Sequence, residues 1–274
     1  MDYIQFYQKT YEYLIEKAKQ HNVSEADLQT YLTPNKGGDL ISDENTKSLN
    51  GVFYRLAFHA QNATMKSNVV QFSKNEKILR DCLYDFDFQA VLKNYTSADC
   101  LYEVLKGKIK SSSNAVKEKQ VLYKYAKSLL RSAVYLKQFD SYAELIDKFL
   151  GLGDMLPIYL SFELEGFGVA LACDFIKELD ERFDFPKPDV HIKGILKELD
   201  LLSETATGDK ENYLCISLTR EIASKMGVSA YRLDKIWWLI CSETFYKHDN
   251  IRNHSDAKRK AYINYIKSWL KSTN

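Results

Sequence analysis

Two short segments of the chain carry residues whose types and spacing could support chemistry on a phosphate-containing substrate. Residues 164–168 read Leu-Glu-Gly-Phe-Gly, and residues 186–189 read Pro-Lys-Pro-Asp. The glycines of the first segment let the backbone approach another molecule closely, because glycine has no Cβ. Amide groups at such a turn, and at the start of the helix after it, attract a phosphate oxygen. We therefore predict a phosphate-binding hairpin at Gly166, Phe167 and Gly168, with an ordinary helix-helix corner as the alternative.

The acidic residue that closes the second segment is a candidate catalytic carboxylate. Pro188 restricts the backbone before Asp189, and the apolar spacing of Ile192 and Ile195 indicates a helix that begins at Val190. Asp189 then occupies the N-cap position, where a carboxylate accepts hydrogen bonds from first-turn amides. A plain helix cap is the competing interpretation. The neighbouring phosphate-binding hairpin favours a role in chemistry.

Helical periodicity dominates the elements that must position these residues. Apolar residues recur every three or four positions in residues 3–15, 121–134, 156–162 and 169–179, whereas strand-like alternation is scarce. The pattern predicts an all-α fold. Clusters of Pro, Gly, Ser and Thr predict loops at residues 34–39, 111–114 and 205–210.

Composition limits the class of protein. The chain has 274 residues and 45% apolar content, which is enough for a substantial buried core. It contains no run of about 18 apolar residues and no signal-peptide pattern at its start, so we expect a soluble intracellular protein. The five cysteines are scattered through apolar segments and are expected to be buried, reduced thiols. The histidines show no metal-ligand spacing, so no catalytic metal and no cofactor are expected.

The charge distribution is more informative than the net charge of +1. Residues 106–131 contain eight Lys and Arg residues against a single acid, Glu118, and residues 247–271 hold a second basic concentration. A surface that contacts phosphates and a set of solvated helix faces explain these clusters equally well. The charge pattern therefore permits a nucleic-acid partner without requiring one.

The two segments together resemble the helix-hairpin-helix DNA glycosylase superfamily, which includes endonuclease III, the adenine glycosylase and the 8-oxoguanine glycosylases. Residues 164–168 are similar to the Leu-x-Gly-x-Gly hairpin of that family. Residues 188–192, Pro-Asp-Val-His-Ile, are similar to its catalytic-aspartate motif, in the same order and at a similar interval. The resemblance implies a bilobal helical fold with a cleft between two subdomains, residues 1–50 plus 200–274 and residues 51–199. It assigns catalysis to Asp189 and allows a monovalent cation at the hairpin.

The same resemblance implies contacts to the damaged base. Residues 57–64 are similar to a family helix end with the pattern Ser-Ala-Gln-x-Thr, although His59 replaces the serine and the threonine falls one place late. Gln61 is thereby expected to contact the lesion or to fill the space left by the extruded base, with a simple surface glutamine as the alternative. Asp234 and Trp238 lie four residues apart on one helical face. They resemble the base-pocket residues of archaeal 8-oxoguanine glycosylases, although core packing would also explain the tryptophan.

One departure from the family pattern concerns the reaction type. Bifunctional members place a nucleophilic lysine two positions after the second hairpin glycine, and this chain has Ala170 there. The resemblance therefore implies base excision by water rather than through a Schiff base, unless Lys177 or Lys187 substitutes.

The expected function is that of a monofunctional DNA glycosylase of base-excision repair. It would hydrolyse the N-glycosidic bond of a damaged base, with 8-oxoguanine as the candidate lesion, flipped from duplex DNA. The expected partner is duplex DNA containing that base, with no membrane contact, for a monomer in the cytoplasm or nucleoid of a bacterium or in a eukaryotic nucleus. Two alternatives remain, namely a non-catalytic DNA-binding or damage-recognition protein and a helical protein-interaction module.

Overall fold

The structure is a computed structural model that describes residues 2–33, 47–62, 69–110, 115–180, 182–243, 245 and 256–273. These residues form only helices and the segments that connect them, so the predicted all-α fold is confirmed for this part of the chain. No helix among them is long and apolar enough to cross a membrane. The loops predicted at residues 34–39 and 111–114 lie outside the described residues.

The chain divides into two compact units. Unit 1 comprises Met1–Lys36 and Asp184–Asn274, and unit 2 comprises Gly37–Phe183. The boundaries implied by the sequence resemblance, at residues 50 and 199, differ from these, because residues 184–199 fall in unit 1 and not with the hairpin. The cleft expected between two subdomains stays a prediction.

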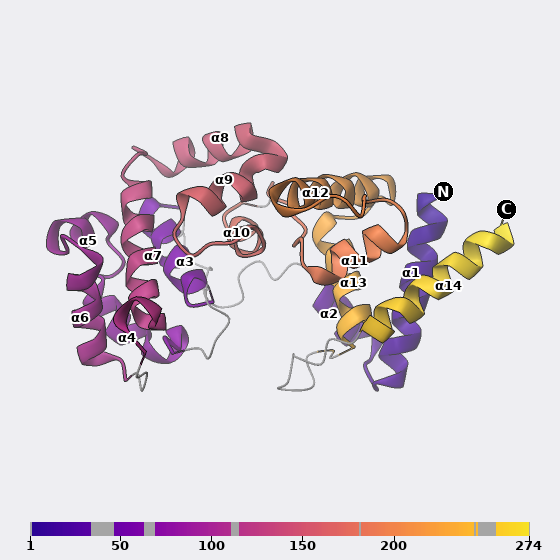
Figure 1. The fold of residues 1–274 in the computed structure, drawn as a ribbon, viewed down its shortest axis with the longest axis horizontal. Coiled ribbons are helices and arrows are strands. Elements are labelled where there is room, and N and C mark those ends of the chain that lie inside the picture. The colour runs from indigo at the N-terminus through magenta and orange to yellow at the C-terminus, as the bar shows by residue number, and fades with distance from the viewer. Residues whose placement is uncertain are drawn as a thin grey trace. The chain divides into compact units, whose positions relative to one another are not determined.

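Unit 1 is built around α13 (Ala230–Ser242). This helix contacts the other helices of its unit, which are α1 (Tyr3–Gln20), α2 (Glu25–Leu32), α11 (Val190–Glu198), α12 (Gly208–Lys225) and α14 (Asp256–Thr273) (Figure 1). The central place of α13 follows from its sequence, because apolar side chains recur on several of its sides. Leu233, Ile236, Trp237 and Ile240 lie on one stripe and Leu239 and Cys241 on either side of it, and all six are 0% exposed. A helix that is apolar over so wide an arc must be covered by several neighbours.

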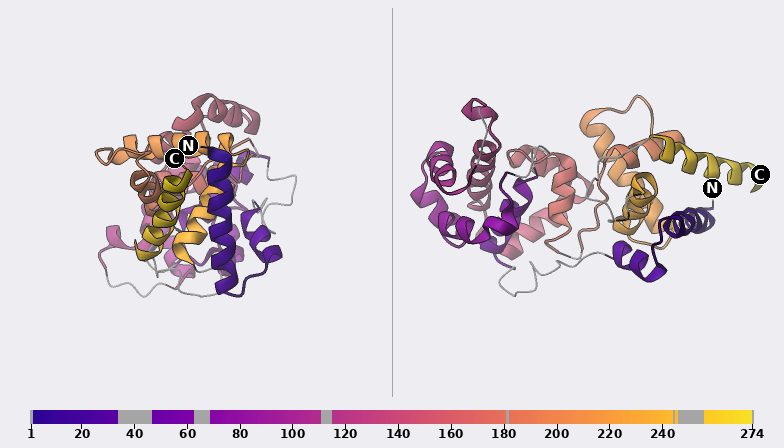
Figure 2. Two further views of the ribbon diagram at one scale, coloured as in Figure 1. Left: turned by 90° about the vertical axis from the view of Figure 1, so that its right-hand side faces the viewer. Right: turned by 90° about the horizontal axis from the view of Figure 1, so that it is seen from below.

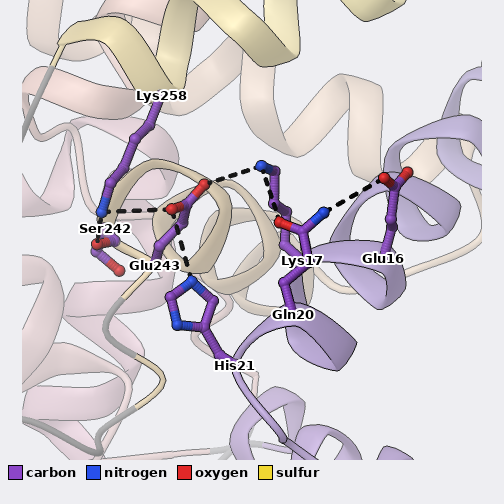
Figure 3. Close-up of polar contacts among 7 residues, drawn as sticks. All are labelled: Glu16, Lys17, Gln20, His21, Ser242, Glu243 and Lys258. Atoms are coloured by element: carbon purple, nitrogen blue, oxygen red, sulfur yellow. Dashed lines mark hydrogen bonds and ion pairs between the residues drawn. The ribbon is translucent and has the colours of Figure 1, made fainter.

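Glu243 ties the C-terminal end of α13 to α1 and α14 (Figure 3). The residue has a left-handed backbone with φ of 49° directly after the helix. Its carboxylate lies 3.4 Å from Lys17 Nζ, 3.6 Å from His21 Nε2 and 3.5 Å from Lys258 Nζ. Lys258 also donates a hydrogen bond of 2.9 Å to the Ser242 carbonyl oxygen. Residues far apart in the sequence are thereby joined at one corner of unit 1.

Unit 2 is organised around α7 (Val121–Leu136), which contacts α3 (Leu49–Ala60), α5 (Phe88–Asn94) and α6 (Ala98–Lys108) (Figure 1; Figure 2 gives two further views of the ribbon). The remaining helices of this unit are α4 (Phe72–Cys82), η2 (Lys117–Lys119), α8 (Tyr142–Leu152), η3 (Gly153–Met155), α9 (Leu156–Glu163) and α10 (Val169–Ile176). Apolar residues at helical spacing hold α7 in place, and Leu122, Leu129 and Leu136 are each 0% exposed.

Three details differ from the sequence-based expectations. The helix after the hairpin, α10, ends at Ile176 and not at residue 179, and α12 begins at Gly208 inside the loop predicted for residues 205–210. Of the five cysteines four are buried, but Cys100 is exposed. It lies in the first turn of α6, on the outer face, where its Sγ is 3.4 Å from Ser97 Oγ. The prediction of a buried thiol was therefore wrong for Cys100.

Candidate active site

The glycine hairpin between α9 and α10 leaves backbone amides without side-chain partners. Gly166 has φ of 83°, a conformation that favours glycine, and the Phe167 amide closes the turn with a 3.2 Å hydrogen bond to the Leu164 carbonyl oxygen. Gly168 is the N-cap of α10 and supplies no side-chain cap. A Cβ placed on Gly168 would meet no atom within 4 Å. The turn is therefore open at the point where a phosphate oxygen could reach the start of α10.

Phe167 anchors the hairpin from inside. Its side chain is 3% exposed and packs edge-on against Phe175, with ring centroids 6.1 Å apart. Phe175 in turn lies edge-on to the His59 ring at 6.1 Å. Phe167 can thus offer a ligand only its backbone, while its side chain fixes the turn to α10, and α10 packs on α3 through Phe175.

Two basic side chains of α7 lie beside the hairpin. Lys127 Nζ is 3.0 Å from Glu165 Oε1. Arg131 Nε donates a 2.8 Å hydrogen bond to the Glu163 carbonyl oxygen, and its Nη2 is 3.4 Å from Glu163 Oε2. Both cationic side chains are about half exposed, at 45% and 48%. Part of the basic cluster predicted from the sequence therefore borders the predicted phosphate-binding turn.

Other members of that basic cluster have different surroundings. Lys117 pairs with Asp99 and lies over the rings of Tyr102 and Tyr123, at 5.5 Å and 5.2 Å. Lys106 also lies over the Tyr102 ring, at 5.4 Å. These lysines pack on the aromatic surface of α6 and the start of α7. The cluster is therefore a composite, and Lys127 and Arg131 are its members that contact the hairpin segment.

Asp189 caps α11 as the sequence predicted. Its Oδ1 accepts hydrogen bonds from the amides of His191, at 2.8 Å, and Ile192, at 3.0 Å. The residue is half-buried, and the next residue, Val190, is 69% exposed. The start of α11 therefore reaches solvent, so a substrate could approach the carboxylate from that side.

The negative charge of Asp189 also contributes to the pKa values of two buried thiols, those of Cys215 and Cys241. Burial raises the pKa of Cys215 to about 12, and the carboxylates of Asp234 and Asp189 add to this increase while Lys193 opposes it. Burial likewise raises the pKa of Cys241 to about 12, with Asp189 contributing in the same direction and Arg259 opposing it. The Asp189 carboxylate therefore contributes to the electrostatic environment of both thiols, and Asp234 contributes to that of Cys215.

The fold places Asp234 beside the segment that carries Asp189. There the Asp234 side chain contacts the backbone of the segment. Its Oδ2 accepts a 2.8 Å hydrogen bond from the Lys187 amide. A second acid, Asp184, accepts hydrogen bonds from the first amides of α13, Ala230 at 2.6 Å and Tyr231 at 2.8 Å. Sequence reasoning missed Asp184, since its partners are 46 and 47 residues away. An acidic residue just before a Pro-x-Pro segment was the only local signal.

The two adjacent tryptophans of α13 have different environments. Trp237 is 0% exposed, and its Nε1 donates a 3.2 Å hydrogen bond to Tyr262 Oη. Trp238 is half-buried at the edge of the core, and Lys235 Nζ lies 5.3 Å from its ring centroid. Trp238 is therefore the tryptophan that retains a partly exposed ring face, one turn beyond Asp234.

Gln61 has a structural partner of its own. It follows α3 directly, is 8% exposed, and its Oε1 accepts a 3.0 Å hydrogen bond from the Phe72 amide. This bond satisfies the first amide of α4, whose N-cap residue Gln71 has φ of 44° and provides no side-chain cap. Gln61 lies in unit 2 with the hairpin, whereas Asp189, Asp234 and Trp238 lie in unit 1.

In the described part of the chain, no three His, Cys, Asp or Glu side chains are grouped so that they could hold a metal ion.

Comparisons with known proteins give one structural similarity. No protein-family model matches the chain, and no curated protein matches it. Among solved structures, the chain is similar to the 8-oxoguanine glycosylase/lyase of Methanocaldococcus jannaschii in complex with a 15mer DNA containing 8-oxoguanine. The sequence identity is 18%, the TM-score is 0.47, and the similarity covers 82% of this chain and 96% of that one.

Proposed function

We propose that this protein is a monofunctional DNA glycosylase that removes a damaged base from duplex DNA. The observation that carries the proposal is the open glycine hairpin, whose Gly168 has free space at its Cβ position and leaves the start of α10 without a side-chain cap. Such a turn suits a backbone phosphate, and a phosphate contact fixes the position of the DNA without reading its sequence. The sequence resemblance of residues 164–168 and 188–192 adds the glycosylase chemistry to this binding site.

Asp189 is the proposed catalytic residue. Positive charge develops on the sugar ring as the base departs, and a nearby carboxylate stabilises that charge. The same carboxylate can orient the attacking water or accept its proton. Its Oδ1 is fixed by two amides of α11, so the group would be held in one orientation during the reaction. Water is the proposed nucleophile because Ala170 carries no amine that could attack the sugar.

The damaged base must leave the helical stack before it can be excised. We propose that the partly exposed ring of Trp238 stacks on the extruded base, with Asp234 accepting a hydrogen bond from it. The Lys187 amide already occupies one position on Asp234 Oδ2, so any base contact would share that carboxylate. 8-Oxoguanine is the proposed lesion, on the strength of the Asp-x-x-x-Trp resemblance at residues 234–238.

A non-catalytic DNA-binding protein is the second candidate function. The observation that favours it is that Asp189 has a structural role as the N-cap of α11. This role explains both hydrogen bonds of its Oδ1 without any catalytic function. The hairpin would bind phosphate in either case. Only a measurement of base release separates the two candidates.

A panel of lesion-containing duplexes tests the proposed function. The protein is incubated in excess with duplexes containing 8-oxoguanine and other damaged purines, and free base and strand cleavage are measured separately. The proposal expects free base and an intact abasic strand, with no covalent adduct after borohydride reduction. Tight binding without release of any base would favour the non-catalytic protein. Absence of binding even at low salt would favour a helical protein-interaction module, since phosphate contacts strengthen as salt falls.

Replacement of Gly168 by alanine is expected to weaken DNA binding without unfolding the protein. The new Cβ would meet no protein atom, so the free energy of unfolding should change by less than about 1 kcal/mol. The methyl group would occupy the space proposed for a phosphate oxygen. Affinity for duplex DNA should fall roughly tenfold, since one charge-assisted hydrogen bond contributes about 1.5–3 kcal/mol.

Gly166→Ala provides the contrasting variant for that experiment. Its φ of 83° makes alanine strained, so this change should lower the free energy of unfolding by about 1–2 kcal/mol. Urea unfolding and fluorescence-anisotropy titration distinguish the two variants. Wild-type affinity in folded Gly168→Ala protein would argue against a phosphate at the start of α10.

Removal of the acid inside the hairpin is expected to strengthen DNA binding. Glu165 places a negative charge beside the proposed phosphate site, and Lys127 partly neutralises it at 3.0 Å. Glu165→Gln should therefore raise affinity severalfold at low salt, an effect that fades as salt screens the charge. Lys127→Gln should lower affinity and reduce the slope of log Kd against log salt by about 1. Glu221→Gln, which disrupts the exposed Lys225–Glu221 pair of α12, should leave affinity unchanged.

A further inference from the structure

The backbone segment that delivers Asp189 is attached to α13 at two points. The chain enters unit 1 at Asp184, and the two oxygens of that carboxylate accept hydrogen bonds from Ala230 and Tyr231, the first residues of α13. Three residues later the Lys187 amide donates to Asp234, one turn further along the same helix. The segment 184–187 therefore runs beside the first turn of α13 and is held at both ends.

The second attachment uses the only backbone donor that the sequence leaves available. Pro186 and Pro188 have no N–H group, so Lys187 supplies the single amide of residues 186–188. Both prolines are buried and Lys187 between them is half-buried, so its amide has little access to water and needs an acceptor from the protein. Asp234 supplies that acceptor at 2.8 Å. The Asp189 amide then donates to the Lys187 carbonyl oxygen at 2.7 Å, so the position of Lys187 determines where Asp189 begins α11.

Capping of α13 does not by itself explain Asp184. The helix already has a local cap, because Ser229 Oγ accepts a hydrogen bond from the Arg232 amide at 3.1 Å. A remote carboxylate at the same helix start adds two charge-assisted bonds, and these join α13 to the Asp189 segment. The aromatic ring of Phe185, 4% exposed beneath the Arg220 guanidinium at 5.0 Å, fixes the segment between the two attachment points.

We propose that Asp184 and Asp234 form an aspartate clamp, a pair of positioning residues that hold the Pro-Lys-Pro link on α13 and thereby fix the Asp189 carboxylate. This inference rests on the proposed function, in which Asp189 is catalytic. It also gives Asp234 a second role beside the proposed base contact. In the clamp, Asp234 acts through the Lys187 amide, and an oxygen acceptor is what the position requires.

The test combines a rate with a readout that does not depend on activity. Single-turnover base release is measured for Asp184→Ala, Asp234→Ala and Asp234→Asn, together with affinity for an uncleaved lesion duplex. Hydrogen exchange of the Lys187 amide is followed by NMR on selectively ¹⁵N-lysine-labelled protein. Both alanine variants should lower the single-turnover rate roughly tenfold or more, because a misplacement of about 1 Å can cost about 100-fold. Affinity for the duplex should be unchanged in Asp184→Ala, whereas Asp234→Ala, which also loses the proposed base contact, should bind more weakly.

The Asn variant and a local-cap variant separate positioning from other roles. Asp234→Asn keeps an oxygen acceptor for the Lys187 amide, so exchange of that amide should stay near wild type. Asp234→Ala should speed exchange of that amide roughly tenfold, the loss expected for one charge-assisted hydrogen bond. Ser229→Ala removes the local cap of α13 and should lower the midpoint of unfolding with no loss of rate in folded protein. Where Asp184→Ala fails to fold, Asp184→Asn replaces it and should show an intermediate rate.

Three outcomes would overturn the aspartate clamp. The first is an unchanged Lys187 exchange rate in Asp234→Ala. The second is exchange of the Lys187 amide as fast in Asp234→Asn as in Asp234→Ala, which would mean that the side-chain oxygen at position 234 does not hold that amide. The third is a Ser229→Ala variant that loses as much rate as Asp184→Ala, which would reduce Asp184 to a helix cap. Failure of the wild-type protein to release any base would instead refute the proposed function, and exchange of the Lys187 amide would then decide alone whether the clamp exists.

Discussion

Asp189→Asn is expected to lower base release by roughly 100-fold or more while the protein stays folded and keeps its affinity for DNA. The size of the loss follows from removing a negative group aimed at developing positive charge, which typically costs about 100- to 1,000-fold. Asparagine is as good an N-cap as aspartate, so its side-chain oxygen can still accept hydrogen bonds from the His191 and Ile192 amides. The variant therefore separates chemistry from capping.

Asp87→Asn is the matched control for this substitution. Asp87 caps α5 in the same manner, because its Oδ1 accepts hydrogen bonds from Gln89 at 2.9 Å and Ala90 at 3.1 Å. Loss of charge at Asp87 should leave base release unchanged. Single-turnover rates and thermal unfolding of both variants provide the comparison. Equal rates for Asp189→Asn and wild type would reduce Asp189 to an ordinary cap.

Trp237→Ala is expected to cost about 3–5 kcal/mol of stability, the largest effect on folding among the substitutions considered. Trp237 is 0% exposed, and its indole N–H bonds to Tyr262 Oη. Tyr262 is itself 2.8 Å from Thr10 Oγ1. Removal of the ring would leave a cavity where α1, α13 and α14 meet and would break this buried polar chain. Urea unfolding gives the free energy directly.

Trp238→Ala tests the neighbouring position, where a different result is expected. The ring is partly exposed at the edge of the core, so its loss should cost less stability than the loss of Trp237. It should instead weaken binding of lesion DNA by about 1–3 kcal/mol, the contribution of one stacked base. Trp238→Phe should restore most of that affinity, because it keeps an aromatic face. If the wild type, Trp238→Ala and Trp238→Phe all bind damaged and undamaged duplexes equally well, Trp238 does not contact the damaged base.

The local features of the site could be predicted from the sequence. Pro188 before Asp189, and an apolar stripe after it, indicated a helix that begins at Val190 with Asp189 as its cap, and the structure confirms this. The glycines at 166 and 168 indicated a turn between two helices, and the left-handed backbone of Gly166 explains why glycine is needed there. In both cases the determining interactions lie within a few residues, so the pattern contains the information.

The features that sequence analysis missed depend on long-range contacts. Asp184 bonds to the start of α13, 46 residues away, and this attachment helps to place residues 184–199 in unit 1. The lesion contact predicted for Gln61 stays a prediction, and the sequence did not reveal that its Oε1 bonds to the Phe72 amide, the first amide of α4, which has no side-chain cap from Gln71. No local pattern reveals which distant amide a side chain will reach.

Free base released by wild-type protein and by Asp189→Asn, measured side by side on a lesion duplex at saturating protein, tests the central claim most directly. The predicted result is release of free base by the wild type, an intact abasic strand, and at least roughly 100-fold slower release by the variant at equal occupancy of DNA. The contradicting result is a protein that binds the duplex and releases no base, or a variant that releases it as fast as the wild type.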